Sequence, residues 1–366
     1  MQTLLTFLIV LGVLVFVHEL GHFVAARLLG VGVKEFGFGF PPRLWGFKRK
    51  DTVYSINWIP LGGFVRLHGE DGEEKDPHSF GVQPVWKRVT ILVAGVGMNI
   101  VLAIVIFAVG FGIGFPTDIT DGIPAGSRAR DPQVQIISVQ AQSAASAAGL
   151  QVGDALVTLN GTPIATVTDA QAAAKAAGER AVSVSYRRGQ AERQTTATLK
   201  NLSETGQPGL GVSLAETAYV SYPPLRALAE GVQAGVSSLW YILEQFGLLI
   251  GRLFSHQPVG DAVAGPVGIA VLTGQVAKLG FTYLMQFAAL LSLNLAIINI
   301  LPIPALDGGR LLFVIIEKLR GKPVTQQIEA KIHSTSFAIL IGLIALVTLR
   351  DVFKLDAVRN LWERLF

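Results

Sequence analysis

The sequence contains four long apolar stretches, and these decide what kind of protein it can form. They cover residues 4–26, 89–115, 281–301 and 335–349, and the last reaches spanning length if it extends to residue 353. A transmembrane helix needs about 20 apolar residues to cross about 30 Å of hydrocarbon. Only 15% of the 366 residues are charged and 51% are hydrophobic, too few charges to cover a soluble protein of this length. The sequence therefore predicts a polytopic α-helical membrane protein with four transmembrane helices.

Basic residues indicate which loops face the cytoplasm. They gather between the first two stretches and between the last two, at Lys34, Arg43, Lys48, Arg49, Lys50, Arg66, Lys75, Lys87 and Arg88, and at Arg310, Lys318, Arg320, Lys322 and Lys331. Because short loops rich in Lys and Arg stay in the cytoplasm, we expect both segments there, with the N-terminus and the long middle segment outside. Residues 225–254 are also apolar, but polar and charged side chains interrupt them. We expect an amphipathic helix at the membrane interface.

The first apolar stretch carries a metal-binding pattern. It contains the run His18-Glu19-Leu20-Gly21-His22, which has the form H-E-x-x-H. Positions i and i+4 share one face of a helix, so both imidazoles can hold one zinc ion while Glu19 lies beside a bound water. A chance pair of polar residues is the alternative. Each ionisable group inside an apolar span costs about 2.5 kcal/mol or more, which favours a functional site.

Asp307 is the best candidate for a third ligand. The sequence has no Cys, so every protein ligand must be His, Asp or Glu. Asp307 follows Pro302 and Pro304, which cannot both remain in a regular helix and therefore break the third span. Irregular backbone survives at membrane depth only inside protein or along a water-filled cavity. The predicted topology brings Asp307 to the cytoplasmic half of the first span, where both histidines lie. A kinked exit loop with a solvated Asp is the alternative.

Two asparagines lie on or near the third span. The amides of Asn294 and Asn299 can stabilise an oxyanion or bind a substrate backbone. Hydrogen bonding between helices is the alternative, since it is common for Asn in membrane spans. The position of Asn299 beside the proline break favours the site, whereas Asn294 remains open between the two.

These motifs resemble the site-2 proteases, and above all the bacterial regulator-of-sigma-E type. The run from Asn299 to Gly309 has the form N-x-x-P-x-P-x-L-D-G-G, and it follows the H-E-x-x-H span in the expected order and topology. Further likeness lies in the runs Pro60-Leu61-Gly62-Gly63-Phe64, Gly95-Val96-Gly97-Met98-Asn99 and Gly265-Pro266-Val267-Gly268-Ile269. The resemblance covers nearly the whole chain.

The resemblance implies a site and a reaction. Zinc would be bound by His18, His22 and Asp307, with Glu19 as general base and with Asn294 and Asn299 in substrate binding or transition-state stabilisation. The reaction would be hydrolysis of a peptide bond within or near a transmembrane helix, near the cytoplasmic side of the bacterial inner membrane. Substrates would be single-pass membrane proteins trimmed outside by an upstream protease, such as anti-sigma factors, or remnant signal peptides. The net charge of +4 makes no case for nucleic acid as a partner.

The middle segment has a soluble composition and resembles a PDZ domain. The run from Ala148 to Gly161 looks like the A-G-L-x-x-G-D…N-G signature of that domain. We expect strands at 134–139 and 182–186 and a helix at 170–177, in one inserted extracytoplasmic α+β domain. PDZ domains bind peptides by adding a strand; obstruction of bulky substrates is the alternative. The regulator-of-sigma-E type carries two tandem PDZ domains, whereas this chain has room for one.

The first cytoplasmic loop contains β-strand patterns. Residues 35–40 alternate aromatic and small side chains, and residues 53–59 resemble a strand that leads into a Pro-Leu-Gly-Gly turn. An edge strand near the site can hold an unwound substrate by β-augmentation. We therefore expect a re-entrant β segment, with these candidate substrate-binding residues: Phe38, Gly39, Gly62 and Gly63.

The expected organisation follows the chain in nine parts. These are the first span at 1–29, the cytoplasmic β loop at 30–87, the second span at 88–115, the PDZ domain at 116–201, a linker with the interfacial helix at 202–278, the broken third span at 279–310, a cytoplasmic loop at 311–333, the fourth span at 334–353 and an extracytoplasmic tail at 354–366. His256 and His333 fall outside any ligand spacing, so we expect them to be ordinary surface or interfacial residues.

Two other functions fit parts of the sequence. A membrane-tethered PDZ adaptor with a non-proteolytic core would have lost a ligand or the base, and the sequence retains both. A metal or ion transporter would favour internal repeats and charges spread over several spans. The candidate ligands converge at one depth instead, which favours the protease.

Overall fold

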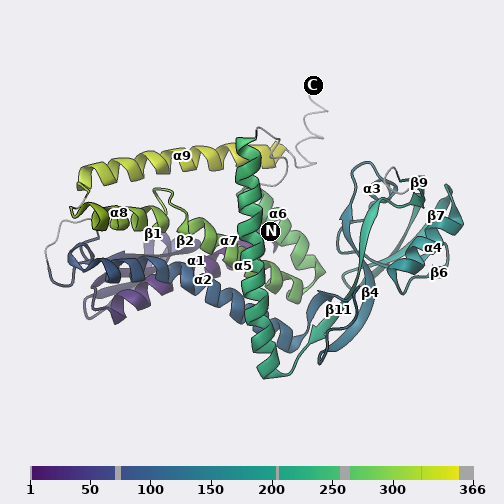
Figure 1. Ribbon diagram of the computed structural model, residues 1–366, viewed down its shortest axis with the longest axis horizontal. Helices are drawn as coiled ribbons and strands as arrows, with labels where there is room; N and C mark the ends of the chain where they lie inside the picture. The colour runs from purple at the N-terminus through teal and green to yellow at the C-terminus, as the bar shows by residue number, and fades with distance from the viewer. Residues whose placement is uncertain (1, 71–75, 203–205, 256–263, 323, 354–366) are drawn as a thin grey trace. The chain divides into compact units, whose positions relative to one another are not determined.

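The computed structural model describes most of the chain (Figure 1). The described residues are 2–70, 76–202, 206–255, 264–322 and 324–353. The expected tail at 354–366 and His256 lie outside them. The chain divides into two compact units, of which the first comprises Met1–Ile106, Val232–Gln275 and Phe287–Phe366 and the second comprises Phe107–Gly231 and Val276–Gln286.

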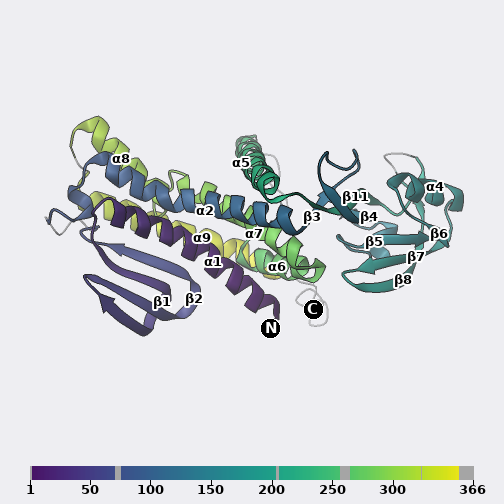
Figure 2. The same ribbon diagram turned by 90° about the horizontal axis from the view of Figure 1, so that it is seen from below.

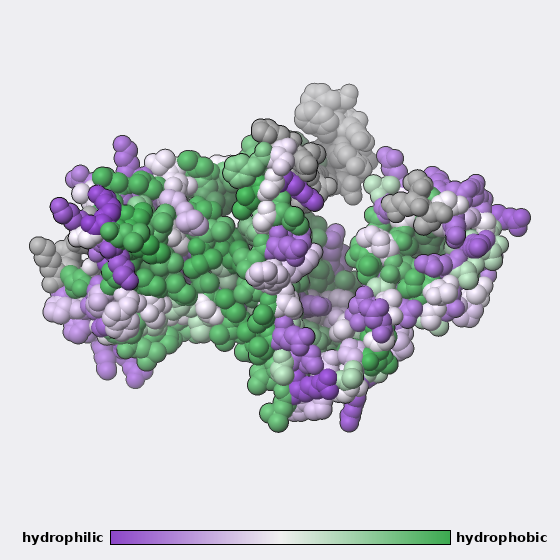
Figure 3. Space-filling view, in the orientation of Figure 1, coloured by the Kyte–Doolittle hydropathy of each residue, from purple (hydrophilic) through white to green (hydrophobic). Residues whose placement is uncertain are grey.

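Four helices of the described residues are long and apolar enough to cross a membrane. They are α1 (Gln2–Leu28), α2 (Val85–Ile113), α7 (Phe281–Ile300) and most of α9 (Gln326–Phe353). Large apolar side chains on them remain exposed, such as Leu4 and Ile9 on α1 and Ile339 on α9. Figure 3 shows the corresponding hydrophobic surface over the helices of the first unit. Helices with apolar surfaces of this kind need lipid as their solvent, which makes this a membrane protein.

The structure has further helices among the described residues. They are η1 (Phe80–Val82), α3 (Ala144–Ala147), α4 (Val167–Ala177), α5 (Pro224–Phe254), α6 (Pro266–Leu279) and α8 (Asp307–Arg320). Helix α7 ends at Ile300, and α8 begins six residues after Leu301, at Asp307. The two prolines of this connection cannot continue α7, because a proline lacks the N–H that an inner helical turn needs.

A small sheet packs against α1 in the first unit (Figure 2). It is formed by β1 (Val33–Arg49) and β2 (Thr52–Leu67), which bend so that residues 33–38 pair on one side with 63–67 and on the other with 53–56. The segment 63–67 therefore forms the sheet edge beside α1. Gly62 allows this approach: it has φ +122°, and a Cβ there would lie 2.5 Å from Val15 Cγ1 of α1.

The second unit contains a seven-stranded sheet in the order β3-β11-β4-β5-β7-β8, with β6 beside β5. The strands are β3 (Phe115–Asp118), β4 (Arg128–Val139), β5 (Ala155–Leu159), β6 (Thr162–Pro163), β7 (Ala181–Arg188), β8 (Ala191–Thr198) and β11 (Val212–Ser221), while β9 (Lys200–Asn201) pairs with β10 (Pro208–Gly209). The predicted strands at 134–139 and 182–186 and the predicted helix at 170–177 are confirmed by β4, β7 and α4.

One expectation about this unit is wrong. Residues 202–224 were expected to be linker, but β11 lies between β3 and β4 in the sheet. Four residues of β11 are buried: Ala215, Thr217, Ala218 and Val220. The sheet therefore extends beyond residue 201, because the strand that completes it comes after the segment that carries the recognised signature.

Asp154 explains why the signature of this unit contains an acidic residue. Its buried carboxylate accepts a hydrogen bond from Gln151 N–H at 2.8 Å and two from Arg188, both at 2.7 Å. Asp154→Ala leaves the Arg188 guanidinium without its carboxylate partner, so we expect a loss of about 3 kcal/mol in the stability of this unit. Resistance of the sheet to trypsin on heating measures the effect, with the exposed Glu192→Ala as control. Equal resistance of the two variants would contradict it.

Candidate metal centre

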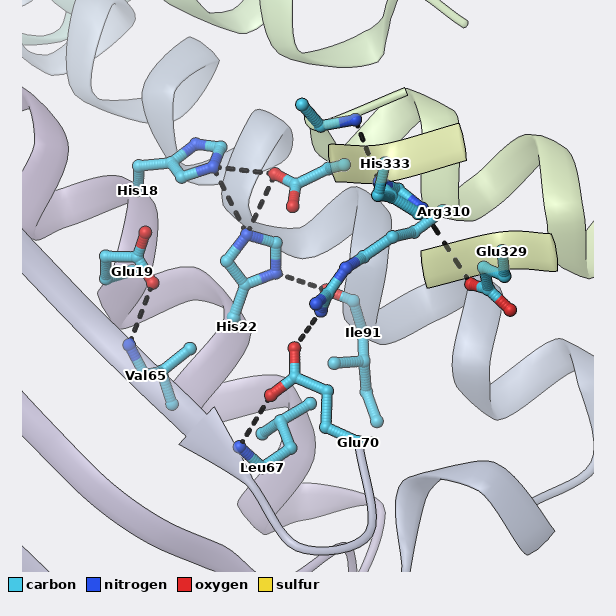
Figure 4. A network of polar contacts seen from close by, with 12 residues as sticks. His18, Glu19, His22, Val65, Leu67, Glu70, Ile91, Arg310, Glu329 and His333 are labelled. Carbon is cyan, nitrogen blue, oxygen red and sulfur yellow. Dashed lines mark hydrogen bonds and ion pairs between the residues drawn. The ribbon is translucent and has the colours of Figure 1, made fainter. Parts of the chain in front are cut away.

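Side chains of α1 and α8, far apart in the sequence, converge in the first unit, and Figure 4 shows the two histidines of α1. His18 Nε2 and His22 Nε2 lie 2.8 and 3.1 Å from the same oxygen of Asp307, Oδ2. The two Nε2 atoms are 3.2 Å apart. These three residues form the one group of three or more His, Asp or Glu side chains among the described residues that can hold a metal ion.

Helices α1 and α2 orient the two imidazoles. His22 Nδ1 lies 2.8 Å from the carbonyl oxygen of Ile91 and donates to it, which leaves the lone pair of Nε2 for a metal. The Nδ1 atom of His18 faces the amide of Asn99, a fully buried residue of α2, at 3.2 Å. The Asn99 Oδ1 atom is buried without a hydrogen-bond partner. Rotation of the Asn99 amide by 180° exchanges its oxygen and nitrogen, and Oδ1 then accepts a hydrogen bond from His18 Nδ1–H.

The donor set fits zinc. Zinc takes His nitrogen and carboxylate oxygen at about 2.0–2.2 Å in a tetrahedron, which separates neighbouring donor atoms by about 3.3–3.6 Å. The three donor separations of 2.8, 3.1 and 3.2 Å are shorter than that, so the three donors gather around one point and a small outward movement lets them hold the ion. With both Nδ1 atoms directed at α2, both Nε2 lone pairs face the Asp307 carboxylate, as a two-His, one-carboxylate site requires.

Glu19 is held beside this group by the small sheet. Its Oε2 atom accepts a hydrogen bond from the backbone N–H of Val65 at 3.0 Å. Figure 4 shows its other carboxylate oxygen on the side of His18. Val65 belongs to the edge segment 63–67, so the strand that approaches α1 also fixes the carboxylate that the sequence predicts to be the base.

The structure separates the two asparagines. The amide nitrogen of Asn299 lies 3.4 Å from His18 Nε2, which brings it to the three-ligand group. The amide of Asn294 donates instead to the carbonyl of Leu290, one turn earlier in α7. Asn299 therefore adjoins the site, and Asn294 has a hydrogen bond within its own helix.

The four candidate substrate-binding residues lie on β1 and β2. Phe38 is exposed, with its ring 5.8 Å from that of Phe16 on α1. Gly39, Gly62 and Gly63 are buried. The glycines therefore allow close packing of the backbone, and of the four residues it is Phe38 that presents an open side-chain surface.

Sequence reasoning missed three polar residues around the site. In the sequence, Asn99 belongs to one of the runs that resemble the site-2 proteases, and no role was assigned to it. Glu70 belongs to no motif of the sequence, but its carboxylate accepts a hydrogen bond from Leu67 N–H and pairs with Arg310 of α8. His333 was expected to be an ordinary surface or interfacial residue, and this is wrong, because its ring accepts a hydrogen bond from the loop before Asp307. None of these pairings has a sequence spacing that could reveal it.

Comparison with known proteins assigns the chain to a family. The profile of Peptidase family M50 matches residues 6–343. The chain belongs to peptidase family M50. Relatives in this family include the zinc metalloprotease RasP of Geobacillus kaustophilus, 30% identical over 97% of this chain and 98% of that protein. The regulator of sigma-W protease RasP of Bacillus subtilis is also 30% identical, over 97% of this chain and 99% of its own.

Family membership identifies the protein as a zinc metalloendopeptidase, and the His–His–Asp group agrees with that cofactor. Solved structures similar to part of the chain include the PDZ domain of an SdrC-like protein from Listeria monocytogenes. That domain is 20% identical, with a TM-score of 0.22, over 24% of this chain and 92% of its own.

Proposed function

We infer that this M50 peptidase cleaves peptide bonds within or near transmembrane segments of single-pass membrane proteins. One observation carries the inference: His18, His22 and Asp307 meet at helices whose composition suits a bilayer. A hydrolytic centre built between such helices serves substrates that also lie in the membrane, since a soluble peptide gains nothing from that setting.

The residues at this site have three kinds of role. His18, His22 and Asp307 would hold the zinc ion, which would act as a Lewis acid that lowers the pKa of water and polarises a carbonyl. Glu19 accepts the proton of the attacking water and returns it to the leaving amine. The Val65 N–H keeps the Glu19 carboxylate in place during both transfers. Asn299, at 3.4 Å from His18 Nε2, is suited to donate to the oxyanion or to the substrate backbone.

The β1–β2 sheet supports a mode of substrate binding. The peptide bonds of a helix are closed in internal hydrogen bonds, so a transmembrane substrate must unwind before water can attack. A sheet edge offers replacement hydrogen bonds to the unwound chain. In this proposal the β1–β2 sheet enters the membrane as a re-entrant segment, with Phe38 and the glycines Gly39, Gly62 and Gly63 shaping the bound strand.

The setting of the reaction follows from the charge pattern and the family. The basic loops favour an active site near the cytoplasmic side of the inner membrane, with the second unit, a single PDZ-type domain, outside. The name of the Bacillus subtilis relative links that protein to sigma-W regulation. Anti-sigma factors and signal peptide remnants, first cut outside by another protease, are the substrates we propose for this chain.

The experiment uses purified full-length protein in detergent with two substrates. One is a single-span protein lacking its extracytoplasmic domain, and the other is a soluble unfolded protein. Mass spectrometry of the products locates the cut. Cleavage of the first substrate inside its apolar segment is the expected result. Cuts confined to soluble sequences, at equal rates in both substrates, would overturn the membrane-segment proposal while leaving the peptidase assignment intact.

A proline at position 65 tests the coupling between strand and base. Val65→Pro removes the N–H that Glu19 accepts and also interrupts the sheet edge. We expect kcat to fall by about 100-fold, since a displaced general base contributes little. Val65→Ala keeps the N–H and serves as the matched control, with near-normal activity expected. Similar rates for both variants would show that neither the hydrogen bond nor the strand edge matters.

A further inference from the structure

The loop that carries Asp307 has a contact from the fourth apolar helix. Leu301 to Leu306 connect α7 to α8, and Asp307 is the first residue of α8. The backbone N–H of Ala305 donates a hydrogen bond of 2.8 Å to Nδ1 of His333, on α9. Figure 4 shows this side chain reaching from α9 toward the ligand loop. A residue 26 positions beyond Asp307 in sequence therefore supports the backbone two residues before it.

The hydrogen bond from Ala305 determines the protonation state and the tautomer of the His333 imidazole. Since Nδ1 accepts a hydrogen bond, the ring is neutral and its proton lies on Nε2. The Nε2 atom is buried without a hydrogen-bond partner, and it lies 3.8 Å from Glu329 Oε1 on the same helix. The ring also packs against Phe313 of α8, with centroids 5.3 Å apart. The contact with Ala305 is thus the hydrogen bond that orients this side chain.

Ala305 needs such support. Its φ of +85° lies in the left-handed region, which is unfavourable for a residue with a Cβ. The next residues depend on this turn, because Leu306 N–H donates to Ile303 O and Arg310 N–H donates to Leu306 O. An Ala305 N–H without an acceptor would add the cost of an unpaired polar group to that strain. Relaxation of the turn would move the start of α8, where the Asp307 carboxylate is attached.

We propose that His333 is a positioning residue for the metal centre. It holds Ala305 in its left-handed conformation, so that Asp307 Oδ2 meets both histidine Nε2 atoms. The fourth apolar helix then contributes to metal binding without providing a ligand. The inference rests on the proposed assignment of Asp307 as the third ligand.

The two possible roles of His333 predict different effects of substitution. If His333 merely fills space between α8 and α9, an apolar side chain of similar volume replaces it well. If it positions Ala305, the replacement must carry an acceptor where Nδ1 lies. The Asn side chain offers its Oδ1 at that place, whereas Leu offers none. His333→Asn and His333→Leu therefore separate the two roles.

The experiment measures zinc affinity of the full-length protein by competition with a chromogenic chelator, together with kcat and KM. We expect His333→Leu to bind zinc about 10-fold or more weakly, with a lower kcat and an unchanged KM. His333→Asn should recover most of the zinc affinity.

Three outcomes are decisive. Wild-type zinc affinity in His333→Leu overturns the positioning role. Equal weakening in both variants, with thermal stability retained, overturns it too, since the acceptor then does not matter. Failure of the wild type to bind zinc would instead contradict the ligand assignment on which the inference rests.

Discussion

Glu19→Gln is expected to abolish peptide hydrolysis while leaving zinc bound. The amide keeps the size of the carboxylate, and its oxygen can still accept the Val65 N–H hydrogen bond. Unlike the carboxylate, the amide cannot take a proton from water. Loss of a general base typically costs about 10²–10⁴-fold in rate, so kcat should fall by at least about 100-fold. Cleavage of the single-span substrate and zinc content are measured on the same preparations.

The control and the contradicting outcomes are clear for this variant. Glu244→Gln changes an exposed carboxylate on α5 and should behave as wild type. If Glu19→Gln loses zinc as well as activity, Glu19 supports the metal site rather than acting as a base. If it retains activity, the water is activated without this carboxylate. If it keeps zinc and loses activity, the assignment of Glu19 as base is supported.

The metal group was accessible from the sequence for physical reasons. His18 and His22 are one helical turn apart, so local geometry alone aligns them, and apolar surroundings make such residues conspicuous. Asp307 required a second step, from charge patterns to topology. Such a step is feasible because the bilayer restricts the arrangements of helices far more than water does.

The supporting contacts were not accessible in the same way. His333 contacts Ala305 across 28 positions, and Glu70 pairs with Arg310 across 240. Such contacts depend on how whole elements pack, and no periodicity or motif encodes them. The same limit explains the error at β11, which lies within the segment expected to be linker but pairs with β3 and β4. Local patterns thus identified the candidate metal ligands, whereas tertiary packing determines the residues that hold them in place.

The two histidine rings pack against α2, and Gly95 determines how closely that helix approaches them. A Cβ at Gly95 would lie 2.7 Å from His22 Cε1 and 2.9 Å from His18 Cε1, and still closer to His22 Nε2. Carbon atoms in favourable contact are about 3.5–4.0 Å apart. The rings cannot simply turn away, because His22 Nδ1 is bonded to Ile91 O and His18 Nδ1 faces Asn99, both on α2 itself.

Gly95→Ala should therefore displace both ligands and weaken zinc binding by about 10–100-fold, with activity lost in proportion. Gly97→Ala is the matched control: it lies two residues further along α2, and nothing among the described residues is within 4 Å of its added Cβ. Alanine also has the higher helix propensity, by about 1 kcal/mol, so neither variant should weaken α2 itself. Chelator competition and cleavage rates compare the two. Wild-type zinc affinity in Gly95→Ala would mean that α2 can withdraw from the histidines, and that its packing does not set the geometry of the metal group.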